Sequence, residues 1–145
     1  MFSTTCEYAL RALVRLAQMP NGSAILGRDL AQNAEIPANY LSKILLTLRN
    51  AGILTTARGT GGGYRLRKPA EEIRLIHVVE LFDGARARPA CLLGCKECSD
   101  EDPCSAHDLW RDVRAVYVNF LETTTLASIS KDKNAAPAAD SAAAS

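Results

Sequence analysis

Apolar residues recur at helical spacing through the N-terminal third of the chain. The stretch 3–18 predicts an amphipathic helix, because its apolar positions follow the i, i+3, i+4, i+7 pattern of one helix face. Turn-forming residues at 20–23 end this helix, and a short second helix is expected over 28–33. A third helix is expected over 38–50, where Gly52 is placed to cap its end. The apolar faces of the first and third helices consist of Ala9, Ala12, Leu13 and Leu16, and of Leu41, Ile44, Leu45 and Leu48.

The second and third predicted helices are joined by a short turn at 34–37, and the third is amphipathic and basic. This is a helix-turn-helix pattern, although a small helical bundle would show the same helices. The following segment favours the helix-turn-helix, because strand-forming residues at 53–58 and 64–67 flank a glycine-rich tip and predict a β-hairpin. A hairpin with arginines and a glycine tip is typical of a DNA-binding wing. The rival interpretation, a nucleotide phosphate loop, requires a Gly-Lys-Ser/Thr sequence and a following helix, and the chain has neither.

The C-terminal part predicts two more helices. A short apolar helix is expected over 75–82, with His77 as a packed core residue. A long helix is expected over 105–126, with apolar residues spaced 4, 3 and 4 apart. This spacing is typical of a helix that pairs with a second copy of itself, and packing on its own domain is the alternative. The predicted dimer interface consists of Leu109, Val113, Val116 and Phe120.

The predicted fold class is mainly α with a small β wing: a winged helix-turn-helix domain plus a long dimerisation helix. The last residues are rich in Ala, Ser, Asp and Lys, and we expect a disordered tail because they lack the apolar content to pack. The expected divisions are the winged helix-turn-helix domain at 1–83 with its wing at 53–67, a cysteine-rich loop at 84–104, the dimerisation helix at 105–128 and the tail at 129–145.

Composition and charge narrow the class of protein. Of the 145 residues 48% are hydrophobic, enough for a core, yet no apolar run approaches the roughly 20 residues that span a bilayer. Charged residues interrupt the first helix, which excludes a signal peptide, so we expect a soluble, cytoplasmic protein without membrane contact. The net charge of +1 conceals a segment, 38–68, with six basic residues and no acidic one, while the rest of the chain sums to −5. Such segregation favours binding to a polyanion.

The five cysteines divide into one isolated residue and one cluster. Cys6 lies alone in the first helix and is expected to be a small core residue. Cys91, Cys95, Cys98 and Cys104 fall in one loop, which in a reducing cytosol favours a metal site over disulfides. Zinc with four thiolates, or three plus His107, is one interpretation, but paired C-x-x-C knuckles are missing. A radical-SAM site would need a large barrel. An iron–sulfur cluster fits the loop best.

Several motifs together resemble the Rrf-type winged helix-turn-helix regulators, the bacterial family that includes the iron–sulfur regulator IscR and the nitric-oxide sensor NsrR. The resemblance covers roughly residues 1–128. The cysteine loop, which ends in Cys104-x-x-His107-x-x-Trp110, also resembles that of the family. The other matching motifs are Glu7-Tyr8-Ala9-Leu10, Tyr40-Leu41, Leu48-Arg49-x-x-Gly52-Ile53-Leu54 and Arg58-Gly59-x-Gly61-Gly62-Gly63-Tyr64.

The resemblance implies a homodimer with a crossing dimer helix and a cluster held by Cys91, Cys98 and Cys104. A [2Fe–2S] cluster is favoured, with [4Fe–4S] as the alternative. The implied fourth ligand is His107 as in IscR-like members, or Glu7, as in NsrR-like members, from the partner subunit. Cys95 is an additional thiol, and its role is left open.

The sequence therefore predicts a transcription regulator, not an enzyme, that binds a double-stranded DNA operator as a homodimer and is controlled by an iron–sulfur cluster. A clusterless or zinc-bearing DNA-binding regulator with direct thiol sensing is the alternative, and an electron-transfer or cluster-carrier protein would not need the acid-free basic segment. Ser42 and Lys43 replace the Glu and Gln of IscR-like readers, so a different operator is expected. The predicted DNA-contacting residues are Asn39, Tyr40, Ser42 and Lys43 near base edges, Arg49 on a phosphate, and Arg58 and Arg65 in the wing.

Overall fold

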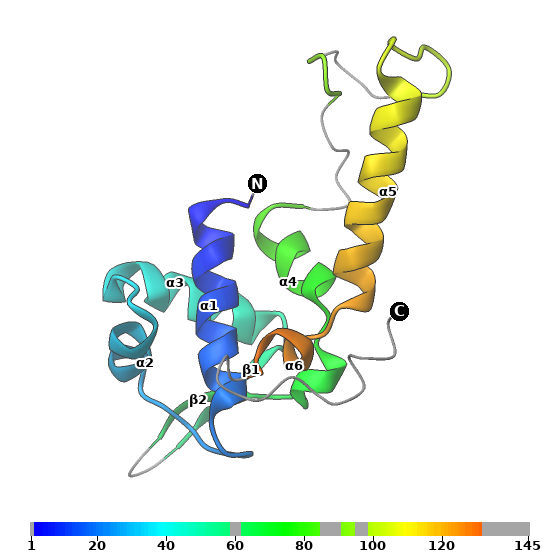
Figure 1. Cartoon of the computed structure of the whole chain (residues 1–145). Helices are drawn as coiled ribbons and strands as arrows, with labels where there is room; N and C mark the ends of the chain where they lie inside the picture. Colours follow the sequence, from blue (N-terminus) through cyan, green and yellow to red (C-terminus); the bar gives the residue numbers. More distant parts are fainter. Residues whose placement is uncertain (1, 59–61, 85–90, 95–98, 132–145) are drawn as a thin grey trace.

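The computed structural model describes residues 2–58, 62–84, 91–94 and 99–131. It is mainly helical with one two-stranded antiparallel sheet, as the sequence predicts. Figure 1 shows a body built from the N-terminal helices, from which one long helix projects. The elements in chain order are α1 (Thr4–Gln18), α2 (Gly27–Ala34), α3 (Ala38–Asn50), β1 (Leu54–Ala57), β2 (Gly63–Leu66), the short 3-10 helix η1 (Ala70–Glu72), α4 (Leu75–Phe82), α5 (His107–Thr123) and α6 (Leu126–Ile129).

Helix α1 begins where two side chains satisfy its free backbone N–H groups. The Ser3 hydroxyl accepts a hydrogen bond from the Cys6 backbone N–H at 3.1 Å, which is the usual N-cap arrangement. Asp83, directly after α4, accepts from the Ser3 backbone N–H at 2.8 Å and from the Ser3 hydroxyl. The start of α1 is therefore held to the end of α4.

The helix-turn-helix is formed by α2 and α3, which pack with α1 around a single core. Leu30 of α2, Leu41, Leu45 and Leu48 of α3 and Leu13 of α1 are all at most 1% exposed. Helix α2 ends at Ala34, and the φ of 55° at its C-cap, Glu35, turns the chain so that Ile36 enters this core. The predicted apolar faces of both long N-terminal helices are thus confirmed as buried.

The wing is attached to the body by a third backbone segment. Strands β1 and β2 pair from Leu54 opposite Leu66 to Ala57 opposite Gly63. Tyr64 also exchanges two backbone hydrogen bonds with Ile25, at 2.8 and 3.0 Å, just before α2. The hairpin tip at 59–61 lies outside the described residues.

The predicted C-terminal helix is wrong in one respect, because the chain breaks at Thr124 and Thr125 into α5 and the short α6. Thr125 caps α6 by accepting from the Ser128 N–H at 3.2 Å. At the break, the Thr124 carbonyl accepts from the Leu75 N–H at the start of α4, and the Leu126 N–H donates to the Ile73 carbonyl, two residues before α4. The helical spacing alone does not reveal these contacts. The expected start at 105 also moves, to His107.

Two further expectations meet different outcomes. His77 is exposed on α4 and is not a core residue, which corrects the sequence-based interpretation. The predicted disordered tail falls, from residue 132 onward, outside the described residues. None of the helices in the described part of the chain has the length and apolar content needed to cross a bilayer.

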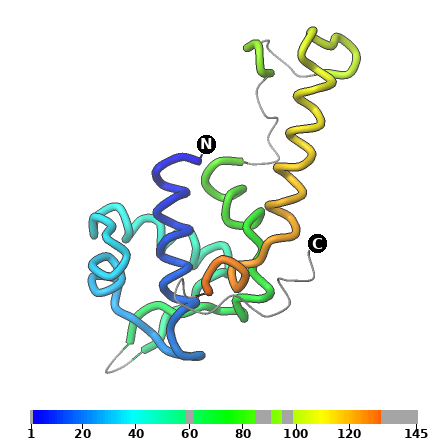
Figure 2. Tube along the Cα trace, viewed as in Figure 1, coloured from blue at the N-terminus to red at the C-terminus, as the bar shows by residue number. Residues whose placement is uncertain are grey.

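Among the described residues, helix α5 packs against the body at its C-terminal end. Leu121 is fully buried in a second core with Cys6 of α1 and Leu75, Ile76 and Val79 of α4. The predicted interface residues lie along the projecting part and are exposed: Leu109 78%, Val113 56%, Val116 71% and Phe120 48%. The tube in Figure 2 shows α5 extending away from the body. The alternative that this apolar stripe packs on its own domain is therefore wrong.

Replacing Gly63 with alanine should destabilise the wing. Gly63 has a φ of +148°, and a Cβ there would lie 2.2 Å from the Ile25 carbonyl oxygen. We expect Gly63→Ala to lower the free energy of unfolding by about 2 kcal/mol or more, measured by urea denaturation. Gly27→Ala is the matched control, because a Cβ there meets only side-chain atoms at 3.6 and 3.7 Å. Equal stability of the two variants would contradict this account of the wing.

Candidate functional site

Helix α3 presents one polar face to solvent. Four of its apolar residues are buried, whereas Leu46 is 51% exposed. The side chains predicted to lie near base edges or phosphate are all exposed: Asn39, Tyr40, Ser42, Lys43 and Arg49. The Ser42 hydroxyl donates to the Asn39 carbonyl at 2.9 Å, so it is held against its own helix. Pro37 provides no side-chain cap, which leaves the first N–H groups of α3 without a side-chain acceptor. This end of α3 can therefore accept an anionic group.

The wing places two arginines beside this helix-turn-helix. Arg65 lies in β2 opposite Thr55 and is exposed, whereas its neighbours Tyr64 and Leu66 pack against the core. Arg58 directly follows β1 and is also exposed. Both predicted wing residues are thus accessible, at the side of the molecule where the hairpin leaves the body (Figure 1).

Arg11 of α1 supports the turn between α2 and α3. Its Nη1 donates to the carbonyl oxygens of Ala34 at 3.4 Å and Glu35 at 3.3 Å, and its guanidinium lies 5.4 Å from the centre of the Tyr8 ring. The Tyr8 ring in turn meets Tyr40 of α3 edge-on, with ring centres 6.0 Å apart. From the sequence alone, Arg11 was predicted only to be a charged position on the first helix, and its contact with the turn was missed. The i, i+3 spacing of Tyr8 and Arg11 was the available signal.

The described part of the cysteine loop lies beside the first turn of α5, at the end remote from the body (Figure 1). The sulfur atoms of Cys91 and Cys104 are 3.5 Å apart. Cys91 is 6% exposed, and Cys104 is half-buried. His107 is 5% exposed, and its backbone N–H donates to the Cys104 carbonyl at 3.0 Å. The two sulfur atoms thus lie in contact, and the buried His107 begins α5 directly after the Cys104 turn.

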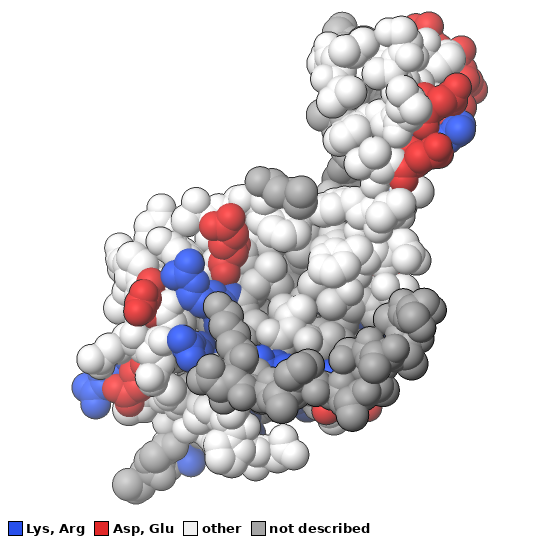
Figure 3. Space-filling view, viewed as in Figure 1, with Lys and Arg blue, Asp and Glu red and all other residues white. Residues whose placement is uncertain are grey.

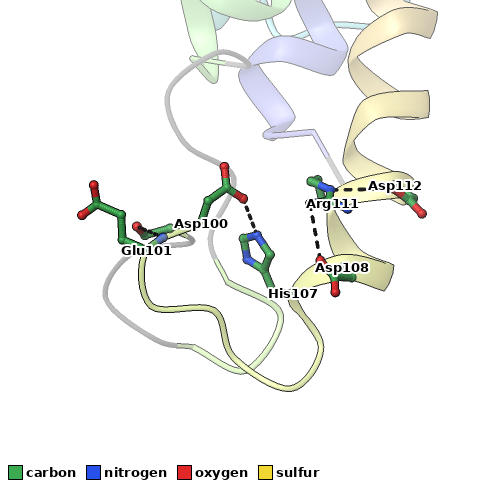
Figure 4. A network of polar contacts seen from close by, with 7 residues as sticks. Asp100, Glu101, His107, Asp108, Arg111 and Asp112 are labelled. Carbon is green, nitrogen blue, oxygen red and sulfur yellow. Dashed lines mark hydrogen bonds and ion pairs between the residues drawn. The ribbon is translucent and has the colours of Figure 1, made fainter.

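The His107 side chain is oriented by an acidic residue. Its Nε2 lies 2.7 Å from Asp100 Oδ1, as the close view in Figure 4 shows. This hydrogen bond with His107 lowers the pKa of the Asp100 carboxyl. His107 would have to exchange Asp100 for a metal in order to ligate through Nε2.

Of the other predicted ligands, the structure describes only Glu7. Cys95 and Cys98 lie outside the described residues. Glu7 is exposed on α1, in the body. Within the described ranges no group of three or more His, Cys, Asp or Glu side chains is arranged to hold a metal ion.

The donors nevertheless fit a thiolate-bound metal centre. Two thiolates on one tetrahedral ion lie about 3.7 Å apart, given metal–sulfur bonds of about 2.3 Å. The separation of 3.5 Å between Cys91 and Cys104 is close to this value. Thiolates and imidazole are also the donor types that iron–sulfur clusters and zinc accept.

Cys6 has a different environment from the loop thiols. It is fully buried in the second core, as predicted. Burial, with a smaller contribution from the Asp83 carboxylate, raises the pKa of the Cys6 thiol to about 12. The thiolate is the reactive form, so Cys6 is inert at neutral pH.

The end of the molecule that carries the cysteine loop is acidic. Residues 99–112 contain five acidic side chains and one arginine, and all six are exposed. Figure 3 shows these acidic side chains gathered on the projecting lobe. Two ion pairs of Arg111, with Asp108 at 3.4 Å and Asp112 at 3.9 Å, offset only part of this charge. The lobe therefore repels a polyanion.

A helix-turn-helix with an exposed polar reading face, followed by a wing and an anchored projecting helix, defines a winged-helix transcription regulator. The sequence profile of Rrf2, described as an iron-dependent transcriptional regulator, matches residues 2–132. The chain belongs to the Rrf2 family. Its relatives are transcriptional regulators, which agrees with the expectation of a protein that is not an enzyme.

Individual relatives agree with this assignment. A protein of Mycobacterium tuberculosis named as an HTH-type transcriptional regulator is 37% identical over 128 residues, which is 88% of this chain and 79% of that protein. IscR of Vibrio atlanticus is 32% identical over 126 residues, covering 87% and 72%. CymR, the global cysteine regulator of B. subtilis, has a TM-score of 0.78 at 26% identity and covers 91% of this chain and 98% of its own. IscR of T. potens, at 22% identity and a TM-score of 0.72, shares the fold.

Removing the Arg11 side chain should loosen the helix-turn-helix. We expect Arg11→Ala to lower the free energy of unfolding by about 1 kcal/mol, because two backbone carbonyls at the end of α2 lose a cationic donor. We also expect it to weaken binding to duplex DNA. Arg15→Ala removes the same charge one turn later and is the matched control. If both variants lose DNA affinity and stability equally, Arg11 acts only through its charge.

Proposed function

We propose that this protein is an operator-binding Rrf2 regulator whose DNA affinity is set by an iron–sulfur cluster at the free end of α5. The observation that carries the proposal is the contact between the Cys91 and Cys104 sulfur atoms beside the start of this helix, where His107 is buried. The other end of the helix is packed in the body that carries the helix-turn-helix. A change in ligation at one end of α5 thereby acts on the element that connects to the body.

The proposed DNA interface is α3 together with the wing. Asn39, Tyr40, Ser42 and Lys43 read base edges in the major groove, and Arg49 contacts a phosphate. Arg58 and Arg65 reach the adjacent minor groove or phosphates. Two features support this assignment: the acid-free basic segment 38–68, and the acidic lobe that keeps the opposite end of the molecule away from DNA.

The proposed dimer forms through the exposed stripe of α5. The four stripe side chains are between 48% and 78% exposed, and large apolar side chains in such a row on a helix typically mark an interface. Pairing of two such helices places two α3 helices in one molecule, as a palindromic operator requires.

The proposed cluster ligands are Cys91, Cys98, Cys104 and His107, with Glu7 of the partner subunit as the alternative fourth ligand. A [2Fe–2S] cluster is favoured, and when bound it supplies iron that oxidants and nitric oxide attack. In this chain, Cys91 and Cys104 would hold the cluster as thiolates, and His107 would do so through the Nε2 that now contacts Asp100. The buried position of His107 limits the access of water to that bond.

A second candidate is a DNA-binding regulator without a cluster, with zinc or with thiols that react directly. The observation in its favour is the contact between the Cys91 and Cys104 sulfur atoms. The likeness to CymR, named a global cysteine regulator and crystallised in an oxidised form from Staphylococcus aureus, agrees with this candidate as well.

Anaerobic purification followed by DNA titration tests the proposal. We expect visible absorbance at ~320–450 nm with bound iron and sulfide, lost in Cys104→Ser and retained in the control Cys6→Ala. A duplex selected by the protein from a randomised library should bind with an affinity that changes about 5- to 150-fold when nitric oxide or oxygen destroys the cluster. The logarithm of the binding constant should fall with the logarithm of salt at a slope near about −5 for a dimer with three phosphate contacts per subunit.

Each outcome of that experiment has a distinct meaning. A colourless protein that holds zinc, or no metal, contradicts the cluster and supports the second candidate, a regulator without a cluster. A salt slope near zero removes α3 and the wing from the DNA interface. An affinity unchanged by cluster loss removes the cluster from regulation.

A charge in the apolar stripe of α5 should separate the proposed dimer. We expect Val116→Glu to weaken self-association about thirty-fold, about 2 kcal/mol, because a carboxylate is buried against an apolar partner. Sedimentation equilibrium measures the change. Ala115→Glu adds the same charge at an exposed position on another face of α5 and should leave the dimer intact. A monomeric wild type, or equal effects of both variants, would contradict the interface.

A further inference from the structure

We propose that Cys91 and Cys104 form a reversible intramolecular disulfide when the loop holds no metal. The inference concerns the same site as the proposed function and rests on it only in that two of the proposed cluster ligands are the reacting thiols. In the metal-free protein, each of these two sulfur atoms is thus assigned the other as its disulfide partner.

The geometry requires little movement. The two sulfur atoms are 3.5 Å apart, and a disulfide bond of about 2.05 Å closes this gap with a shift of about 1.5 Å. Both cysteines lie at turns: the Gly94 N–H donates to the Cys91 carbonyl at 3.0 Å, and the His107 N–H donates to the Cys104 carbonyl at 3.0 Å. The backbone therefore presents the two side chains to each other without help from a bound ion.

Burial gives the two thiols different roles. Cys91 is 6% exposed, whereas Cys104 is half-buried and lies three residues before the start of α5. A reagent from solvent therefore reaches Cys104 first, and Cys91 is the resolving thiol. Cys6 takes no part, because it is enclosed in the second core away from the loop.

The reaction balances with a low-molecular-weight disulfide, RSSR, as the oxidant. The Cys104 thiolate attacks one sulfur of RSSR, and the Cys104–S–S–R bond forms as the R–S–S–R bond breaks and releases RS⁻. The Cys91 thiolate then attacks the Cys104 sulfur and releases the second RS⁻. The protons of the two protein thiols end on two RSH molecules. Two electrons pass from the protein to RSSR.

The charge of the lobe selects the reagent. Asp100, Glu101 and Asp102 are exposed close to Cys104 in the chain, so the surface repels an anionic oxidant such as glutathione disulfide. Hydroxyethyl disulfide is neutral and avoids this repulsion. At low ionic strength we expect it to react faster than glutathione disulfide at equal concentration.

The sequence allows the pairing to be mapped without ambiguity. In a Cys95→Ser variant, trypsin and a glutamyl endopeptidase release residues 87–96, 98–101 and 102–111, each with one cysteine. The full-length variant is stripped of metal, reduced, freed of reductant without oxygen, treated with hydroxyethyl disulfide, alkylated and digested. We expect peptides 87–96 and 102–111 to be linked at least ten times more often than any other pair.

Control variants make the result decisive. Cys98→Ser added to Cys95→Ser should retain the link, and Cys91→Ser or Cys104→Ser should abolish it. A link that joins Cys98 to either cysteine, or mixed disulfides with the reagent as the only products, overturns the inference.

Iron and sulfide uptake separates this inference from the proposed function. The oxidised wild-type protein should bind neither until a reductant is added, because two ligands are consumed. If the reduced protein takes up a cluster but the Cys91–Cys104 link never forms, only the inference fails. If the link forms but the reduced protein never takes up a cluster, only the proposed function fails.

Discussion

Helix α1 is buried on two sides, and this double packing is the constraint on which the rest of the structure depends. One side, with Ala12 and Leu13, belongs to the core that holds the helix-turn-helix. Cys6, near its start, belongs to the second core, together with Leu121 of α5. Helix α3, which we propose reads DNA, and helix α5, whose far end lies beside the loop thiols, are therefore positioned by the same fifteen-residue element. Among the described residues, neither core includes a residue of the cysteine loop.

Polar contacts also hold α1 in place, against the end of α4 and against the end of α2. Asp83 holds the start of α1 to the end of α4, and Arg11 holds its middle to the turn between α2 and α3. The small side chain of Cys6 allows α1 to approach α4 and α5 closely. The high pKa of its thiol follows from that packing and protects it from the chemistry available to the loop thiols. The chain thus contains cysteines in two different environments, a buried core and the loop beside α5.

Local patterns were sufficient to predict most of the fold. The leucines of α3, the strand formers around the glycines and the helix-turn-helix order all depend on neighbours in sequence. The features that were missed depend on distant partners: Ile25 pairs with Tyr64, Arg11 with the end of α2, and Leu126 with Ile73. The threonines at 124 and 125 are compatible with a helix, and only their contacts with the start of α4 explain the break.

The candidate site divides in the same way. The exposed face of α3 could be predicted, because a helix with four buried leucine and isoleucine residues must turn its polar residues outward. The spacing of the cysteines gave a donor set but no distances, so the contact of Cys91 with Cys104 and the pairing of His107 with Asp100 required the structure. The apolar stripe of α5 could be predicted as a seam, and its exposure in the single chain required the structure too.

The length of α5 has a mechanical consequence. Seventeen residues at a rise of 1.5 Å make a rod of about 25 Å, which is packed in the second core at Leu121 and projects from the body toward His107. A displacement of about 2 Å at the loop end corresponds to a tilt of only about 5° at the packed end. A lever of this geometry, pivoting in the second core, reduces a displacement at the loop end to a small change of orientation in the body.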